Sequence, residues 1–200
     1  AITYKVMRNL YFVCAHATGN TVYVDTAVIG LRPLSTDLDS VLIFADSVSN
    51  TSRDDRWIHA NVTGVASGNN CGGLPSLRLT VSANIDVLDS VVAGSPVRAF
   101  EVVEARSYSD ASGDLWLGGR RWSKSGGWSS LQPLIGPLDG RGLRFAFFDQ
   151  FGNATTDRTQ VARIAITVIG RTTQPVQLSG GGIGYVVDSM VTQVALRNNR

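Results

Sequence analysis

The sequence predicts a mainly β fold built of antiparallel sheets. Apolar residues alternate with polar ones at period two in many short stretches, and no long window keeps a helical period. Turn-forming residues separate these stretches at short intervals. The charged residues include 16 Arg and 14 Asp but only two Lys and two Glu, and Lys and Glu are good formers of helix surfaces. A GC-rich genome would produce the same skew, so the alternation carries more weight than the composition.

The alternating stretches are the predicted strands, and turn residues close hairpins between them. Ala17–Asn20, Asp110–Gly113 and Asp149–Asn153 have the composition of tight turns. Ser35–Asp39 is expected to form one capped helical turn, and Ile85–Val92 is either a short helix or a turn-rich loop. The predicted strands are Thr3–Cys14, Thr21–Ile29, Ser40–Asp46, Trp57–Val65, Ser76–Ala83, Val97–Tyr108, Asp114–Arg121, Gly142–Phe148, Gln160–Gly170 and Val186–Arg197.

Residues 1–200 are predicted to form a single β-rich globular domain. A chain of this length, with 44% hydrophobic residues and a net charge of +2, is the opposite of a disordered chain and has little charge for long-range attraction of nucleic acid. Ser123–Pro137 and Pro175–Gly184 are poor in regular structure, but neither resembles a flexible linker. The longest apolar runs have six residues, far below the about 18 needed to span a bilayer, so no membrane span is predicted.

Cys14 and Cys71 are the only cysteines. In an exported protein the expected state is one disulfide, which would stabilise the fold by about 4 kcal/mol in the chain-entropy model. Two free thiols are the first alternative. The second is a zinc site of both cysteines with His16 and His59, although zinc ligands usually come in closely spaced pairs and only Cys14 and His16 form one.

No motif in the sequence indicates catalysis, so no enzyme activity, cofactor or metal site is predicted. Neither a Gly-x-Ser-x-Gly elbow nor a phosphate-binding loop occurs. The glycine run at residues 180–184 precedes a predicted strand, which is the wrong context for dinucleotide binding. Asp149 and Asp157 are candidates for a Ca²⁺ site, but the spaced acidic loop is missing and turn capping is the simpler interpretation.

The most unusual stretch interleaves tryptophan with basic residues between Leu115 and Trp128. One interpretation is a patch that stacks on single-stranded nucleic acid or sugar and contacts phosphate. The favoured interpretation is a hairpin whose tryptophans cover a core edge or a subunit interface, where Trp and Arg are enriched. The residues of this candidate interface or ligand patch are Trp116, Arg120, Arg121, Trp122, Lys124 and Trp128.

The second half of the chain carries a recognisable succession of strands and turns. Gly142–Asn153 reads Gly-Leu-Arg-Phe-Ala-Phe-Phe-Asp-Gln-Phe-Gly-Asn, and the Val/Ile-rich stretch Val161–Arg171 follows it. Gly136–Leu138 precedes this pair, Asp188–Asn199 closes the chain, and Val97–Glu101 fits the beginning. The pattern resembles the globular region of prepilin-like proteins, namely type IV minor pilins and the J-type minor pseudopilins of type II secretion.

The resemblance implies a structural subunit of an extracellular fibre or a periplasmic pseudopilus, with other pilin or pseudopilin subunits as partners. Its motifs are packing and turn patterns over residues 97–200, and Phe147 and Phe148 stand where Tyr is commoner in the group. The family's leader cleavage site, fifth-position Glu and long apolar N-terminal helix do not occur in these residues. The resemblance therefore implies that the helix was removed or that a separate small helical chain supplies it.

An exposed apolar strip is expected where such a helix would dock. In the first predicted strand Ile2, Tyr4, Val6, Leu10 and Phe12 need a covering layer. A wholly charged face there would contradict the implication. The alternative function is an exported β-sandwich binding module that recognises glycan or DNA through the tryptophan and arginine hairpin.

Overall fold

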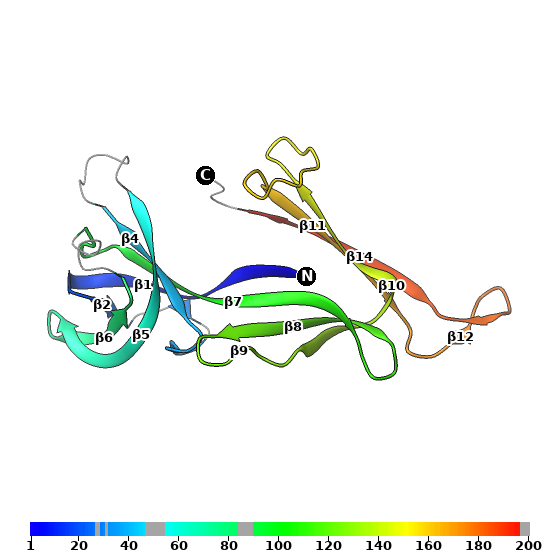
Figure 1. Cartoon of the computed structure of the whole chain (residues 1–200), viewed down its shortest axis with the longest axis horizontal. Helices are drawn as coiled ribbons and strands as arrows, with labels where there is room; N and C mark the ends of the chain where they lie inside the picture. The colour runs from blue at the N-terminus through cyan, green and yellow to red at the C-terminus, as the bar shows by residue number, and fades with distance from the viewer. Residues whose placement is uncertain (27–28, 31, 47–54, 84–89, 197–200) are drawn as a thin grey trace. The chain divides into compact units, whose positions relative to one another are not determined.

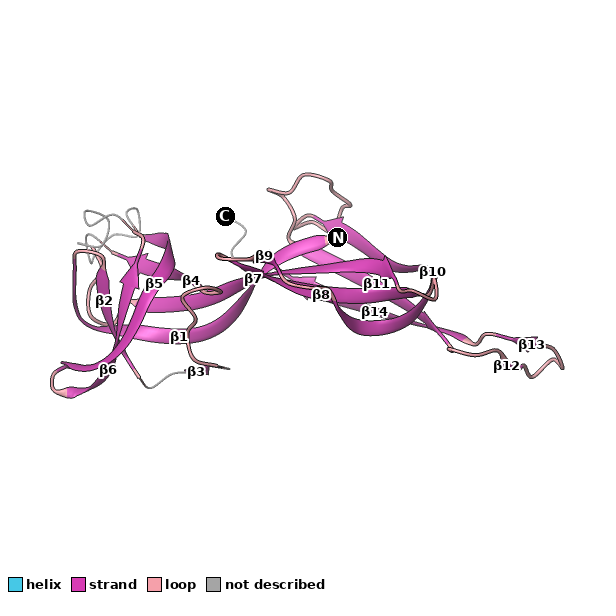
Figure 2. Cartoon of the chain, turned by 60° about the horizontal axis from the view of Figure 1, so that its bottom comes forward, coloured by secondary structure: helices cyan, strands magenta, loops and turns pink. Residues whose placement is uncertain are grey.

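The computed structural model describes residues 1–26, 29–30, 32–46, 55–83 and 90–196. Within these ranges the regular structure consists of strands, which pair antiparallel (Figure 2). The prediction of a mainly β, antiparallel fold is therefore confirmed.

The described residues separate into two compact units. We call residues 2–104 and 120–130 the core unit, and residues 1, 105–119 and 131–200 the sheet unit. Two long strands contribute residues to both units, β7 (Pro96–Ser109) and β8 (Leu115–Ser123). That residues 1–200 act as one domain stays a prediction.

The core unit is a closed ring of strands (Figure 1). Neighbouring strands follow the order β7–β4–β5–β6–β2–β1, and a further pairing of β7 with β1 closes the ring. The ladder between β5 and β6 shifts register between Val62 and Gly64, and such a bulge bends a strand. The remaining bounds are β1 Ile2–Thr18, β2 Thr21–Asp25, β3 Ile29–Gly30, β4 Ser40–Ala45, β5 Arg56–Cys71, β6 Leu74–Val81 and β9 Gly127–Trp128.

Alternate residues of the ring strands form the hydrophobic core of this unit. Strand β4 shows the pattern directly, because Val41, Ile43 and Ala45 are fully buried while the residues between them are not. β-Branched side chains dominate the core, as expected where pleated strands pack side by side. The other core members are Tyr11, Val13, Val22, Val24, Ile58, Ala60, Val62, Leu79, Val81, Val91, Val97 and Ala99.

The sheet unit is built from strands in the order β14–β11–β10–β8–β7. Strand β10 spans Gln132–Phe148, β11 spans Arg163–Arg171 and β14 spans Val187–Ala195. Two short strands, β12 (Val176–Gln177) and β13 (Ile183–Gly184), form a separate hairpin. Among the described residues of this unit, the buried hydrophobic side chains are Leu138, Val161 and Val168.

Several predicted boundaries differ from the observed ones. Strand β10 begins at Gln132 and not at Gly142, because the added residues pair with β8 although their glycines and prolines have low strand propensity. Strand β11 begins at Arg163, since the N–H of Gln160 donates to the C=O of Asp157 in a turn (3.1 Å).

The two segments considered for helix have different outcomes. Residues 35–39 form a single turn, in which the N–H of Asp39 donates to the C=O of Ser35 (2.9 Å). The hydroxyl of Ser35 accepts from the N–H groups of Asp37 and Leu38, both at 3.3 Å, as a cap does. Most of Ile85–Val92 lies outside the described residues.

Candidate interaction surface

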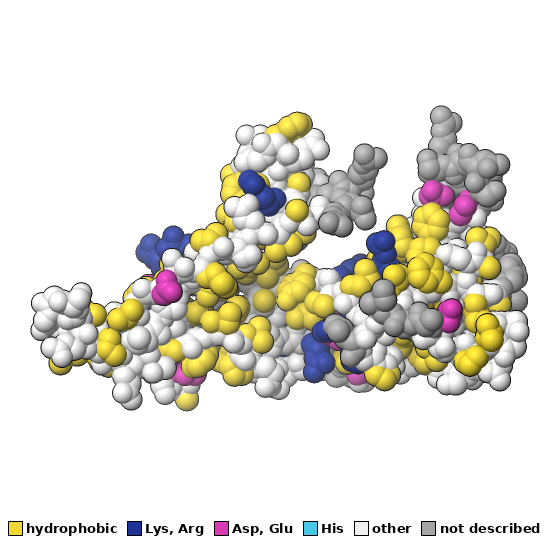
Figure 3. Space-filling model, turned by 180° about the vertical axis from the view of Figure 1, so that it is seen from behind, with side chains coloured by type: hydrophobic (Ala, Val, Ile, Leu, Met, Phe, Trp, Pro, Cys, Tyr) yellow, Lys and Arg dark blue, Asp and Glu magenta, His cyan; other side chains and the backbone are white. Residues whose placement is uncertain are grey.

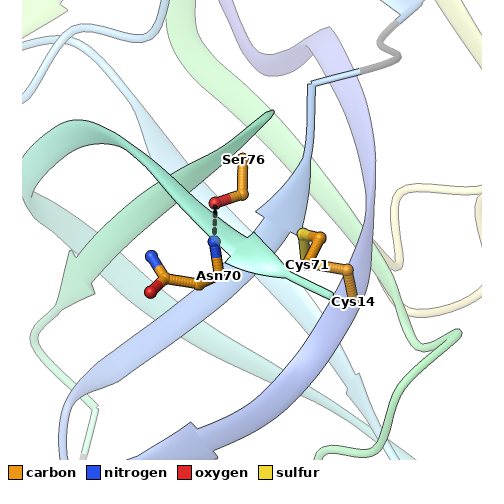
Figure 4. Close-up of a disulfide and its surroundings, with 4 residues drawn as sticks. All are labelled: Cys14, Asn70, Cys71 and Ser76. Atoms are coloured by element: carbon orange, nitrogen blue, oxygen red, sulfur yellow. Dashed lines mark hydrogen bonds between the residues drawn. A yellow bond between two sulfur atoms is a disulfide. The ribbon is translucent and has the colours of Figure 1, made fainter. Parts of the chain in front are cut away.

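The two cysteines form a disulfide between β1 and the end of β5 (Figure 4). The Cα atoms of Cys14 and Cys71 are 5.3 Å apart, within the usual range for a disulfide. Beside it, the N–H of Asn70 donates to the hydroxyl of Ser76 (3.0 Å), which fastens the chain next to Cys71. The predicted disulfide is confirmed, and the free-thiol and zinc-thiolate alternatives are wrong.

The carboxylates considered for Ca²⁺ serve as turn caps. Asp149 Oδ1 accepts from the N–H groups of Phe151 and Asn153, both at 2.8 Å. Asp157 Oδ1 accepts from the N–H and the hydroxyl of Thr159 at 2.9 and 2.7 Å. These hydrogen bonds lower the pKa of Asp157, so its carboxylate already has the partners that its charge requires.

The residues of the predicted tryptophan and arginine patch belong to different units. Trp116 lies in the sheet unit, where its indole N–H donates to Asp110 Oδ2 (2.9 Å) and so fastens the strand to the preceding turn. The other members belong to the core unit: Arg120, Arg121, Trp122, Lys124 and Trp128.

Arg120 is held by groups of its own unit. Its Nε and one terminal nitrogen donate to the two carboxylate oxygens of Glu104 at 2.9 and 3.2 Å. The guanidinium also lies over the ring of Trp128, 4.8 Å from its centroid, and Trp128 meets Trp122 edge to face at 5.4 Å. A guanidinium in this arrangement is oriented by its own neighbours before any ligand arrives. Arg121, Trp122 and Lys124 are the exposed members of this group.

Lys124 binds backbone carbonyls of the same unit. Its ammonium donates to the C=O groups of Thr36 (2.7 Å), Asp39 (2.6 Å) and Val62 (3.1 Å). In addition the N–H of Ser125 donates to a carboxylate oxygen of Asp37 (2.9 Å). An ammonium has three protons to donate, so Lys124 can make all three hydrogen bonds and links the β8–β9 hairpin to the turn at residues 35–39.

The core unit also contains a buried charged cluster that no motif in the sequence indicated. Glu101 is fully buried and forms ion pairs with Arg8 and, at 2.7 Å, with Arg32. Arg32 also binds both oxygens of the buried Asp39 at 2.7 and 2.8 Å. Burial acts to raise the pKa of Glu101, but the hydrogen bonds from Arg8 and Arg32 outweigh it, and its pKa lies below the ordinary value. Two cations and two carboxylates thus neutralise each other, which explains how these charges are tolerated.

One face of the sheet unit is apolar across three strands. Residues that lie opposite each other in an antiparallel ladder project to the same face. Phe147 pairs with Ile164, which pairs with Val194, and Phe145 pairs with Ile166. The pair Gly170 and Asp188 continues this side at one end. We call the other nine residues on this side the apolar sheet face, and they are Leu143, Phe145, Phe147, Ile164, Ile166, Val168, Met190, Thr192 and Val194.

The opposite face of the same strands is mixed in character. It carries the polar residues Arg144, Arg163, Thr167, Ser189 and Gln193 together with apolar residues that include Phe148, Ile169, Val187 and Val191. The sheet therefore has the alternation of a half-buried sheet, with one face apolar and the other more polar.

The apolar sheet face nevertheless remains partly open. Met190 and Val194 are 57% and 45% exposed, and Phe145, Phe147 and Ile166 are only partly buried. Hydrophobic side chains gather along the strands of this unit in the space-filling view (Figure 3, left). A face of this composition is typical of a surface that binds another protein element.

The first strand of the core unit also exposes apolar side chains. Tyr4 and Phe12 are 44% and 47% exposed, while Val6 and Leu10 on the same side of β1 are partly covered. This side of β1 is therefore not wholly charged. A wholly charged side would have contradicted the helix-docking strip that the resemblance to prepilin-like proteins implies.

Comparisons with known proteins do not add a family to these observations. No family model, curated protein or solved structure matches the chain. Among the described residues there is no helix long and apolar enough to cross a membrane.

Proposed function

We propose that this chain is the globular part of a structural subunit of a pilus-like fibre or pseudopilus, and that it works through protein–protein contacts. The observation that carries the proposal is the apolar sheet face, on which the phenylalanine and isoleucine side chains of β10 and β11 are only partly covered and Met190 and Val194 of β14 are exposed. A fibre subunit needs such a face, because the packing of neighbouring elements is what holds the fibre together.

Two further features support the proposal. The strands that build the apolar sheet face come from Gly142–Phe148 and Val161–Arg171, the stretches in which the resemblance to prepilin-like proteins is closest. The Cys14–Cys71 disulfide suits a cell-surface or periplasmic location, since disulfides persist in oxidising compartments. Other pilin or pseudopilin subunits, or a separate helical chain, are the proposed partners.

The proposal is tested by the incorporation of charge variants into fibres. Ile166→Asp places a carboxylate on the apolar sheet face, and Thr167→Asp places the same group on the opposite face of the same strand. In cells that make the chain, we expect Ile166→Asp to lower its recovery in sheared or periplasmic filaments at least about tenfold, because a buried unpaired charge disfavours contact. Thr167→Asp should stay within about twofold of the unchanged chain.

Equal recovery of the two variants in filaments, with both folded by circular dichroism, would contradict the proposal. So would a chain that is never found in filaments. Retention on DNA or glycan columns provides the competing readout, and Arg121→Ala with Trp122→Ala removes two exposed members of the tryptophan and arginine patch. The binding-module alternative has less support, because Arg120 and Lys124 are engaged by Glu104 and by backbone carbonyls.

A further inference from the structure

Strand β14 is the outer strand of the sheet unit. Among the described strands it pairs with β11 alone, in one continuous register from Val187 opposite Arg171 to Ala195 opposite Arg163 (Figure 2). All nine of its residues are exposed. Its other side therefore presents a row of backbone N–H and C=O groups along the whole strand.

The hydrogen bonds at the two ends of the strand determine which groups point outward. The N–H of Leu196 donates to the C=O of Ala162 (2.8 Å), and the N–H of Thr172 donates to the C=O of Val186 (3.0 Å). Hydrogen-bonded pairs alternate along an antiparallel ladder, so the even-numbered residues of β14 bond to β11. The backbone groups of the odd-numbered residues face away from it, and these are Val187, Ser189, Val191, Gln193 and Ala195.

This edge lacks the features by which proteins usually prevent strand addition. Lysine, proline, a bulge or a short strand protects most exposed edges. The sequence Val-Asp-Ser-Met-Val-Thr-Gln-Val-Ala contains no lysine, proline or glycine, and its register with β11 has no shift. The one local cap is at Ser189, whose N–H is accepted by the carboxylate of Asp188 (2.7 Å). That cap occupies one outward N–H and leaves the others available to a partner strand.

We propose that β14 pairs antiparallel with β14 of a second copy of this chain, about a two-fold axis at Val191. This register sets Val191 against Val191, Ser189 against Gln193 and Val187 against Ala195 of the other copy. Each of these residues faces outward, so every outward N–H except the capped one of Ser189 meets an outward C=O. A second copy therefore offers a matching edge, because hydrogen-bonded and non-hydrogen-bonded pairs keep alternating across the junction.

Charge and side-chain character favour the same register. Asp188 is the only charged residue of β14, and the antiparallel register sets it against Val194 of the other copy. The two Asp188 carboxylates then lie about 20 Å apart along the ladder, beyond the screening length at physiological salt. A parallel pairing would set them side by side. Because the two-fold axis is perpendicular to the sheet, the apolar sheet faces of both copies also lie on the same side of the joined sheet.

The closed geometry limits the assembly to two copies, since each copy uses its only β14 edge. The inference does not rest on the proposed function, because it uses the backbone edge of β14 and not contacts made by the apolar sheet face. Ile166→Asp separates the two, as it should lower incorporation into filaments at least about tenfold and leave the dimer intact.

The first measurement is the molar mass of the full chain in solution as a function of concentration, by sedimentation or light scattering. We expect a monomer–dimer equilibrium. Val191→Pro removes an outward N–H and no bond to β11, so the strand should tolerate it while association weakens at least about tenfold. Val191→Thr keeps the N–H and should dimerise as the unchanged chain does. A monomer at all concentrations up to about 1 mM, or a dimer unaffected by Val191→Pro, would overturn the inference.

Cysteine crosslinking tests the register even if the proline variant does not fold. Met190 of one copy lies opposite Thr192 of the other at a non-hydrogen-bonded site, where the Cβ atoms come closest. A mixture of Met190→Cys and Thr192→Cys chains should therefore crosslink under mild oxidation, and each variant alone should crosslink at least about fivefold less. Equal crosslinking by the single variants, or none in the mixture, would contradict the register.

Discussion

The core unit and the sheet unit place similar β-branched residues in different surroundings. Val41 and Ile43 of β4 are fully buried inside a closed ring, whereas Ile164 and Ile166 of β11 stay partly exposed on one face of a sheet. Both strands alternate at period two and pair on both sides. Ring closure, and not strand composition, therefore creates the core of the one unit, whereas one apolar face of the other unit stays partly exposed.

The two units also differ in how deeply their ion pairs are buried. In the core unit Glu101 is fully buried between Arg8 and Arg32, and in the sheet unit Arg171 and Asp114 form an ion pair while both side chains remain about one-third exposed (28% and 34%). Buried and exposed pairs have different energetic consequences. Loss of one partner should therefore lower the free energy of unfolding more in the buried ion pairs of the core unit than in the exposed ion pair of the sheet unit.

The largest effect is expected when the buried cluster loses one partner. Glu101→Gln removes the charge that balances Arg8 and Arg32 and should lower the free energy of unfolding by about 3–5 kcal/mol. The matched change in the sheet unit, Asp114→Asn, should lower it by less than about 1 kcal/mol. Urea unfolding of both variants measures the difference, and equal losses would contradict the distinction between the units.

The disulfide is expected to have the next largest effect. Replacing Cys14 and Cys71 together by alanine releases a link across a sequence separation of 57 residues in the core unit. The free energy of unfolding should fall by about 2–4 kcal/mol, because the unfolded chain regains the entropy of that loop. Thermal melting of the double variant, followed beside the chain in reducing buffer, checks the effect. A melting temperature that does not change would argue against a structural role for the bond.

Truncation of an aliphatic side chain should lower the free energy of unfolding more in the core unit than in the sheet unit, and this difference should be smaller than the one between the ion-pair variants. Leu79 is fully buried in the ring, so Leu79→Ala should destabilise the chain by about 3 kcal/mol through lost transfer energy and the cavity left behind. Ile166→Ala on the apolar sheet face should have an effect of about 1 kcal/mol or less in the isolated chain. Comparable losses by denaturant unfolding would mean that the apolar sheet face is already covered.

The smallest expected effect is the dependence of stability on acid. The pKa of Glu101 is lowered in the folded state from an ordinary value of 4.5, so its ionised form favours folding above pH 4.5 and this contribution is lost as the pH falls through the lowered pKa. Urea midpoints measured from pH 7 to pH 2 should therefore decline below pH 4.5. Glu101→Gln should show a shallower decline over the same range, and an identical slope would contradict this assignment.

Parts of the candidate surface were predictable from particular residues. The strand Gly142–Phe148, the Val/Ile-rich strand after it and the closing strand were all expected, and the structure has them as parts of β10, β11 and β14. Their pairing was not predictable, because register is set by turn geometry and by contacts between distant segments. The apolar sheet face exists only once Phe145 lies opposite Ile166, and Ile164 opposite Val194.

For the tryptophan and arginine stretch, in contrast, the sequence drew attention to the residues but did not predict their contacts. Its spacing was conspicuous in the sequence, but spacing does not reveal that Glu104 lies beside Arg120 or that carbonyls from residues 36, 39 and 62 surround the Lys124 ammonium. The buried cluster of Arg8, Arg32, Asp39 and Glu101 could not be predicted, since Glu101 lies 93 residues from Arg8 and 69 residues from Arg32 in the chain.

The sequence by itself determined the class of the fold and limited the chain to one possible intramolecular disulfide. Alternation at period two and closely spaced turn residues are local properties that predict strands, and Cys14 and Cys71 are the only cysteines. Only the tertiary structure decided that β7 meets β1 to close a ring with a core, and that β14 lies at an edge beside an apolar face. These outcomes depend on which distant strands pair, and pairing energy arises between segments and not within them.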